Sequence, residues 1–122
     1  MTVAWVFPGQ GSQSVGMGGE IFAASPAARG VLARADAALG EPLSKLVAEG
    51  PEETLTLTAN AQPAIVTVSI AFLAALRERH PELGMPAFAA GHSLGEYSAL
   101  VAASAISLED AVRLVRARGR AM

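Results

Sequence analysis

The chain has 122 residues, of which 52% are hydrophobic and 16% are charged, and its formal net charge is -2 at pH 7. This length is enough for one domain with a buried core, and the composition argues against a disordered or fibrous chain. The charge balance gives no reason to expect nucleic acid as a partner. The absence of cysteine excludes disulfides, thiolate metal sites and a cysteine nucleophile.

No basic segment precedes the first apolar run, so we do not expect a secretory signal. The longest mostly apolar stretch, residues 64–76, is shorter than the roughly 20 residues that cross a bilayer. The sequence therefore predicts a cytoplasmic protein that does not enter a membrane.

Apolar runs bounded by glycine, proline and serine divide the chain into strands and helices of an α/β fold. In chain order we predict a strand at 3–7, a glycine-rich irregular segment through residue 19, helices at 26–39 and 42–49, a polar turn region at 52–60, a helix at 63–79 that Pro63 opens, a strand at 87–90, and helices at 96–103 and 108–118. A sheet of two strands leaves its edges and faces uncovered, so we expect an incomplete domain.

Local signals add detail to several of these elements. The continuous apolar run at 3–7 is typical of a strand buried on both faces of a parallel sheet. Ser25 predicts an N-cap and Gly40 the end of the same helix, while a capping-box pattern from Ser107 predicts the start of the last helix. Apolar side chains surround almost the whole circumference of the 63–79 helix, which is typical of an interior helix.

One motif specifies chemistry as well as structure. The segment Gly91-His92-Ser93-Leu94-Gly95 has the pattern Gly-x-Ser-x-Gly between a predicted strand and a predicted helix, the setting of a nucleophilic serine. Side chains two residues before or after Ser93 would clash in so sharp a turn, and glycine avoids the clash. The alternative from the pattern alone is a glycine-flanked turn that happens to hold a serine.

An acyl-transfer site built on Ser93 needs donors for the developing oxyanion. The backbone N–H of Leu94 follows the nucleophile and is the first candidate. Gly9-Gln10-Gly11 is the only glycine-rich loop that follows a predicted strand, so the Gln10 N–H is the second. The same loop lacks the third glycine of a dinucleotide fingerprint and the lysine of a P-loop, which argues against nucleotide binding.

The site also needs a general base, and the chain has two histidines. His92 adjoins Ser93 on a sharp turn, so its side chain should point elsewhere, and His80 lies at a helix end beside a proline. We therefore expect the base to lie outside residues 1–122.

Four arginines lie near the C-terminal end. Arg113, Arg116 and Arg120 are spaced by three and four residues along one helix face, and Arg118 is offset from them. The spacing alone favours a solvated face near a helix C-terminus, where cations complement the helix dipole.

Four segments in this order resemble the bacterial malonyl-CoA:acyl carrier protein transacylases of fatty acid synthesis: Phe-Pro-Gly-Gln-Gly-Ser-Gln at 7–13, Gln-Pro at 62–63, Gly-His-Ser-Leu-Gly-Glu-Tyr-Ser-Ala-Leu at 91–100, and Arg-Gly-Arg-Ala-Met at 118–122. The resemblance implies an α/β-hydrolase-like large subdomain with a parallel sheet and a ferredoxin-like subdomain inserted later in the chain. Residues 1–122 would then be the N-terminal portion of the large subdomain, less than half of such a protein.

The resemblance also implies roles for individual residues. Ser93 would become malonylated, and Gln10 and Leu94 would supply the oxyanion N–H groups. Arg118 matches the arginine that pairs with the malonyl carboxylate, and Gln62 matches a glutamine that lines the site. The residues that would support these are Gly9, Gly11, Gly91, His92 and Gly95.

The implied reaction moves a malonyl group from malonyl-CoA to Ser93 and then to the phosphopantetheine thiol of acyl carrier protein. Both thiols belong to substrates, so no cofactor and no metal are expected. The family's catalytic histidine has no counterpart in residues 1–122, which makes the remainder of an acyltransferase chain an expected requirement. The alternatives are an acyltransferase domain of a polyketide synthase, a serine esterase with the same turn, and a non-catalytic module that folds only on a separately supplied remainder.

Overall fold

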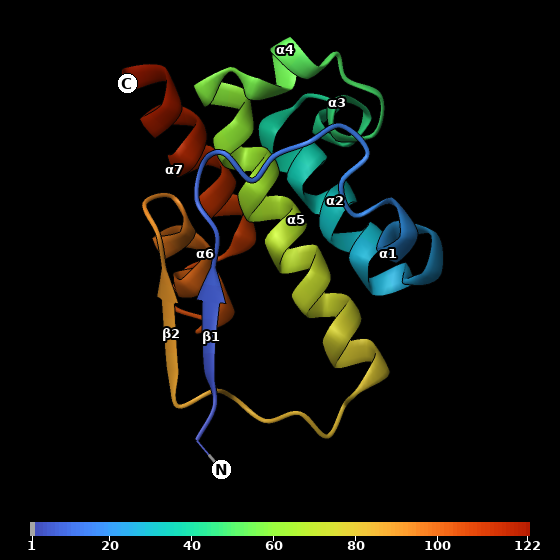
Figure 1. The fold of residues 1–122 in the computed structure, drawn as a ribbon, viewed down its shortest axis with the longest axis vertical. Helices are drawn as coiled ribbons and strands as arrows, with labels where there is room; N and C mark the ends of the chain where they lie inside the picture. Colours follow the sequence, from blue (N-terminus) through green and yellow to red (C-terminus); the bar gives the residue numbers. More distant parts are fainter. Residues whose placement is uncertain (1) are drawn as a thin grey trace.

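The computed structural model describes residues 2–122 as a mixed α/β arrangement (Figure 1). Its elements in chain order are β1 (Ala4–Phe7), α1 (Gly19–Ala24), α2 (Pro26–Leu39), α3 (Leu43–Glu49), α4 (Glu52–Thr56), α5 (Thr58–Arg79), β2 (Phe88–Gly91), α6 (Gly95–Ala102) and α7 (Leu108–Ala121).

The two strands form a parallel sheet, in which Ala4 pairs with Phe88 and Phe7 pairs with Gly91. Because parallel strands have their carboxyl ends at the same edge of a sheet, the loop after β1 and the turn after β2 lie together (Figure 1). The predicted parallel sheet is confirmed for these two strands, and its carboxyl edge is where the glycine-rich loop and the serine motif meet.

Helix α5 forms the centre of the core, and it packs against α2 and α7, which also contact each other. Every residue from Ala61 to Val68 is buried, which confirms the predicted interior helix. Farther along α5, Phe72 and Leu76 are 45% and 43% exposed. The apolar circumference of α5 is therefore fully covered only in its first half.

The start of α5 differs from the prediction. The helix begins at Thr58 and Pro63 lies inside it, while the expected polar turn region at 52–60 contains α4 and the first residues of α5. A proline inside a helix removes one backbone hydrogen bond, but here every residue from Ala61 to Val68 is buried, and this burial outweighs the lost bond. The sequence pattern also does not predict α1, because the glycines before it obscure where the helix begins.

Strand β1 also differs from the prediction of burial on both faces. Phe7 is buried, but Val6 is 77% exposed. Among residues 2–122 the sheet has only these two strands, and the exposure of Val6 shows that this face of β1 is not covered there. The continuous apolar run therefore marks a face that this part of the chain leaves open.

Helix α5 has 22 residues and is long and apolar enough to cross a membrane. The apolar stretch at 64–76 was too short to cross one, but the whole helix is not, so length alone does not exclude a membrane span. Within the fold, however, 61% of its apolar window is buried against other elements. The burial of α5 is that of a core helix.

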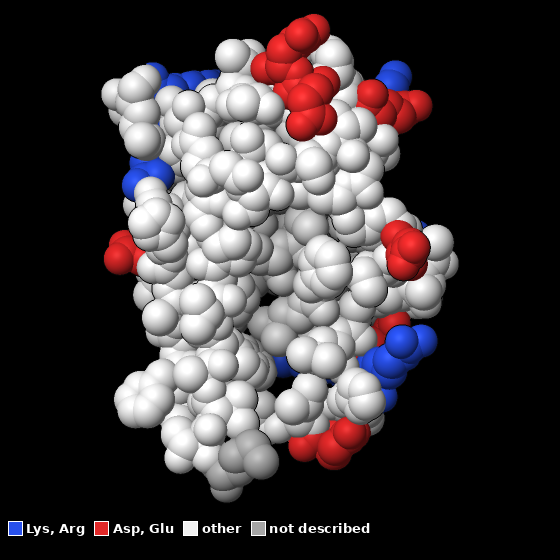
Figure 2. Space-filling view, in the orientation of Figure 1, with Lys and Arg blue, Asp and Glu red and all other residues white. Residues whose placement is uncertain are grey.

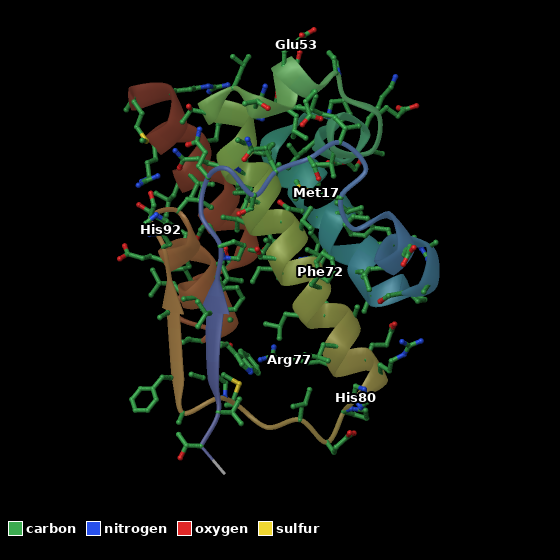
Figure 3. All side chains as sticks on the ribbon, viewed as in Figure 1. Met17, Glu53, Phe72, Arg77, His80 and His92 are labelled. Atoms are coloured by element: carbon green, nitrogen blue, oxygen red, sulfur yellow. The ribbon has the colours of Figure 1, made fainter. Side chains whose placement is uncertain are left out.

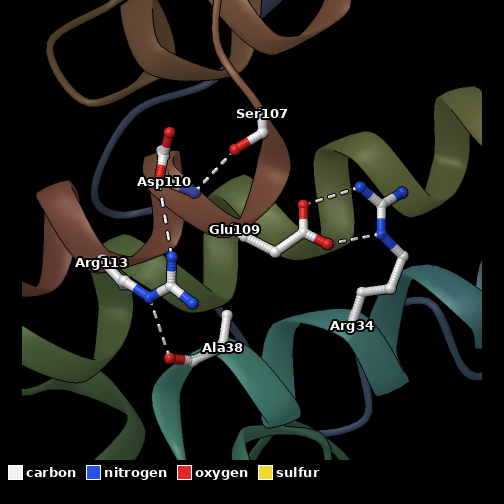
Figure 4. Close-up of polar contacts among 6 residues, drawn as sticks. All are labelled: Arg34, Ala38, Ser107, Glu109, Asp110 and Arg113. Carbon is white, nitrogen blue, oxygen red and sulfur yellow. Dashed lines mark hydrogen bonds and ion pairs between the residues drawn. The ribbon is translucent and has the colours of Figure 1, made fainter.

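The predicted caps are confirmed. The Ser25 hydroxyl accepts a hydrogen bond from the Ala28 N–H at 3.0 Å, and Gly40 ends α2 in the left-handed conformation with φ of 68°. The Ser107 hydroxyl accepts from the Asp110 N–H at 3.0 Å (Figure 4). These local bonds set where α2 and α7 begin.

An ion pair joins α7 to α2 beside this cap. The Arg34 guanidinium donates two hydrogen bonds of 2.8 Å to the Glu109 carboxylate (Figure 4). These bonds, together with one from the backbone, lower the pKa of Glu109 to about 2. Both side chains are partly exposed, so the pair contributes only about 0.2–1 kcal/mol.

The Glu109 pair should make stability depend on pH. Because the folded-state pKa is lowered, the stabilisation is present above the unfolded-state pKa and is lost as the pH falls toward about 2. Glu109→Gln should therefore be less stable than the wild type by up to about 1 kcal/mol near pH 6. In urea titrations this difference should shrink between pH 4.5 and pH 2. The control Glu53→Gln removes an exposed carboxylate that makes no ion pair within residues 2–122 and should show no such change.

Candidate active site

Ser93 lies at the tip of the sharp turn between β2 and α6. Its φ is 57°, a left-handed conformation that non-glycine residues rarely adopt. The turn is held by a hydrogen bond from the His92 N–H to the Phe7 carbonyl at 3.2 Å and by one from the Gly95 N–H to the His92 carbonyl at 2.9 Å. The predicted strand, turn and helix are confirmed, and the surrounding backbone stabilises a strained serine.

The glycines of this region are required by backbone contact. A Cβ atom at Gly91 would lie 2.0 Å from the Gly95 backbone, and one at Gly95 would lie 2.5 Å from the Phe7 carbonyl oxygen. A Cβ atom at Gly9 would lie 2.5 Å from the His92 carbonyl oxygen. The end of β1, the serine turn and the start of α6 are therefore in direct backbone contact. A side chain would clash at Gly9 as well as at the two glycines of the serine motif.

Because of this backbone contact, adding one methyl group at Gly95 should have a large effect on stability. Gly95→Ala should lower the free energy of unfolding by at least about 3 kcal/mol, because its neighbours are backbone atoms that cannot move aside. Gly30→Ala is the matched control, since Gly30 is in α2 with no atom within 4 Å of its added Cβ. It should raise stability by about 0.5–1 kcal/mol. Equal effects of the two substitutions in urea unfolding would contradict the contact.

Two predicted site residues, Gln62 on α5 and Ser93 on the turn, both bond to a third, Arg118 on α7. The Arg118 guanidinium on α7 donates a hydrogen bond of 3.0 Å from Nη2 to Ser93 Oγ and one of 2.7 Å from Nη1 to Gln62 Oε1 on α5. Gln62 is fully buried, and its Nε2 donates to Met122 Sδ at 3.1 Å. The solvated-face interpretation is therefore wrong for Arg118.

Two backbone N–H groups flank the serine from the two loops at the carboxyl edge of the sheet. Within residues 2–122 neither the Leu94 N–H nor the Gln10 N–H has a hydrogen-bond acceptor. Leu94 is the N-cap of α6, and the Gln10 side chain donates to Thr58 Oγ1 at 3.1 Å, which ties the loop to the start of α5. Leu94 is fully buried and Gln10 is exposed, so of the two N–H groups only that of Gln10 belongs to a residue open to solvent.

The described residues bring no general base to Ser93. His80 lies at the far end of α5, where its Nδ1 is 3.1 Å from Glu82 Oε1, and Figure 3 shows it well away from His92. His92 is exposed on the serine turn and makes no side-chain hydrogen bond within residues 2–122. The group bonded to Ser93 Oγ is a guanidinium, which has no acceptor for the hydroxyl proton.

Arg116 is the residue that spacing assigned wrongly. The spacing predicts a solvated face for Arg116 together with Arg113 and Arg120, but Arg116 is only 7% exposed. The sequence holds a usable signal, because the apolar residues Leu108, Val112 and Val115 recur at intervals of three and four residues, and position 116 lies on the same helix face.

An apolar cavity lies away from the serine, between β1, α1 and α5. It has a volume of about 930 Å³ and a mostly apolar lining that includes Val6, Ile65 and Phe72. Figure 2 shows the hollow on a face with few charges, and Figure 3 shows Phe72 and Arg77 beside it. None of the predicted site residues line this cavity, so it is not the site of the serine chemistry.

Residues 4–122 match the model of the acyl transferase domain family. The malonyl CoA-acyl carrier protein transacylase of Bacillus subtilis (strain 168) is 55% identical over 121 residues, which are 98% of this chain and 37% of that protein. The crystal structure of an acyl-carrier-protein S-malonyltransferase from Bartonella henselae superposes with a TM-score of 0.94 at 50% identity, over 99% of this chain and 39% of that one.

A third similar structure holds a malonyl-transacylase in complex with a type II PKS acyl-carrier protein. It has a TM-score of 0.92 and 44% identity, over 98% of this chain and 38% of that one. The chain thus spans less than two fifths of the length of the relatives that it matches. With a family match over nearly all of its residues, the chain belongs to the acyl transferase domain family.

Proposed function

We propose that the polypeptide containing this chain transfers a malonyl group from malonyl-CoA to the phosphopantetheine thiol of an acyl carrier protein, through an ester on Ser93. The observation that carries the proposal is the Arg118 guanidinium, which lies 3.0 Å from Ser93 Oγ and is held by Gln62. A planar guanidinium binds a carboxylate through two parallel hydrogen bonds. An acyl group on Ser93 that carries a free carboxylate would meet this partner, and the similar proteins above are transacylases of malonyl groups.

The chemistry assigned to the site has two half-reactions. The Ser93 hydroxyl attacks the thioester carbonyl of malonyl-CoA, its proton goes to a base, and the CoA thiolate leaves. The N–H groups of Gln10 and Leu94 would donate to the oxyanion that forms. The carrier thiol then attacks the ester, and Ser93 regains its proton. CoA and phosphopantetheine act as substrates, so the proposal needs no cofactor.

We further propose that residues 1–122 are the N-terminal portion of an α/β-hydrolase-like large subdomain, in a cytoplasmic enzyme whose ferredoxin-like insert follows later. Three observations support this. The chain spans 37% of the Bacillus subtilis relative, β1 has an open apolar face, and Ser93 lacks a base within residues 2–122. The remainder would supply the base, for which a histidine is the expected residue.

The test is transfer of radiolabelled malonyl from malonyl-CoA by the complete polypeptide. Label should appear on holo acyl carrier protein and not on the apo form, which lacks the phosphopantetheine thiol. The serine esterase alternative predicts steady release of free malonate whether or not a thiol is present. Release of malonate with no labelled carrier would overturn the proposal.

A polyketide role is the second candidate, because one similar structure holds a carrier protein of that kind. The two roles share the reaction and differ in the carrier. Comparing kcat/KM for carrier proteins of fatty acid and polyketide synthesis decides between them, and a preference for the polyketide carrier would favour the second role.

A further inference from the structure

Arg116 is a buried charge that the proposed chemistry does not use. It lies on α7 and is 7% exposed. Its Nη1 donates to the Ala59 carbonyl at 2.9 Å and to Asn60 Oδ1, and its Nη2 pairs with Glu41. Burial lowers the pKa of Arg116, and Glu41 opposes this, but a guanidinium stays charged in proteins. Burying such a charge costs free energy unless well placed hydrogen bonds and an opposite charge compensate it. The groups that accept hydrogen bonds from Arg116 therefore indicate what the residue does.

The Ala59 carbonyl is an unusual acceptor because of Pro63. In an α-helix this carbonyl accepts from the N–H four residues later, and Pro63 has no N–H. Pro63 is fully buried and Ala59 is partly buried, and a backbone carbonyl withdrawn from water needs another donor. The Arg116 guanidinium donates to the carbonyl that Pro63 leaves without its helical partner.

The same region of α5 and α7 carries the pair at the serine. Arg118 follows Arg116 by two residues, and Gln62 follows Ala59 by three, so both cross-helix hydrogen bonds join the same turns. A Cβ atom at Gly119 would lie 2.7 Å from Ala59 Cα, which shows that the two backbones are in contact here. A shift of α7 along α5 would therefore move the guanidinium that lies 3.0 Å from Ser93 Oγ.

We propose that Arg116 is a positioning residue, which fixes α7 on α5 through the Ala59 carbonyl freed by Pro63 and so places Arg118 between Gln62 and Ser93. This inference rests on the proposed function for its effect on malonyl transfer. The anchoring itself depends only on the two helices.

The anchoring is tested by a double-mutant cycle of unfolding midpoints in the complete polypeptide. Arg116→Met should lower Tm, and Pro63→Ala restores an N–H that the Ala59 carbonyl can accept. We expect the loss from Arg116→Met to be about half as large or less in the Pro63→Ala background. Strict additivity of the two substitutions would overturn the link. Arg116→Lys keeps the charge beside Glu41 without the planar fork, and it should lose less than Arg116→Met.

The positioning is tested by the ratio of kcat/KM for malonyl-CoA to that for acetyl-CoA. Arg116→Met should lower this ratio by about tenfold or more, because a displacement of about 1 Å in a binding group has effects of that size. In an Arg118→Ala background the same substitution should leave the ratio unchanged. Arg113→Met is the control, since Arg113 is exposed on α7 and pairs with Asp110.

If Arg116 only stabilises the fold, Arg116→Met should lower malonyl transfer and acetyl transfer by the same factor. That result would overturn the positioning role. If the wild type transfers no malonyl group, the proposed function fails. The double-mutant cycle of unfolding midpoints would still decide whether the hydrogen bond from Arg116 to the Ala59 carbonyl stabilises the fold.

Discussion

Ser93→Ala in the complete polypeptide should abolish the covalent malonyl adduct in intact mass spectra and lower transfer by at least about 10³-fold. The hydroxyl lies at the tip of the turn, and no other hydroxyl within residues 2–122 is bonded to Arg118. Without it, malonyl-CoA has no nucleophile to acylate beside the guanidinium.

The matched control for this substitution is Ser104→Ala. Ser104 is the other non-glycine residue with positive φ among residues 2–122, at 61°, and it lies exposed after α6. Its loss tests whether removing a hydroxyl from a left-handed serine is harmful in itself, and the adduct should form normally. An adduct of undiminished yield in Ser93→Ala would exclude Ser93 as the nucleophile.

Arg118→Ala should lower kcat/KM for malonyl transfer by about 2–5 kcal/mol, or about 30- to 5,000-fold, because it leaves the malonyl carboxylate without its charged partner. Transfer of an acetyl group, which has no carboxylate, should change little or improve. The substitution also frees the side of Ser93 that the guanidinium now contacts. The measurement is the two kcat/KM values for the same enzyme preparation.

Two further variants sharpen the Arg118 result. Arg118→Lys keeps the charge but cannot bond a carboxylate and Gln62 in the same planar geometry, so its malonyl transfer should be intermediate. Arg113→Ala removes an exposed cation from the same helix and should leave both transfers near the wild-type values. Equal losses of malonyl and acetyl transfer in Arg118→Ala would contradict the proposal that Arg118 binds the malonyl carboxylate.

Much of the local structure could be predicted because its causes lie within a few residues. Ser25, Gly40 and Ser107 set helix ends through bonds to their immediate neighbours, and all three were identified. The serine turn follows from the spacing of Gly91 and Gly95, since their clash is with the turn itself and with the strand beside it. The start of α5 was misplaced because proline usually opens a helix, and only tertiary burial shows why one lies inside.

The candidate site also has one part that could be predicted from the sequence and one that could not. Residue types and spacing were enough to identify a serine between two glycines, a glycine-rich loop after the first strand, and Gln62 and Arg118 as candidate site residues. The contacts of Arg118 with Gln62 and Ser93 could be seen only in the folded chain, since these residues lie 56 and 25 positions away from it in the sequence. The folded chain also shows that Arg116 is buried and that one face of β1 is open. Helix period and capping depend on neighbouring residues, whereas these contacts depend on how α5, α7 and the sheet pack, which no local pattern encodes.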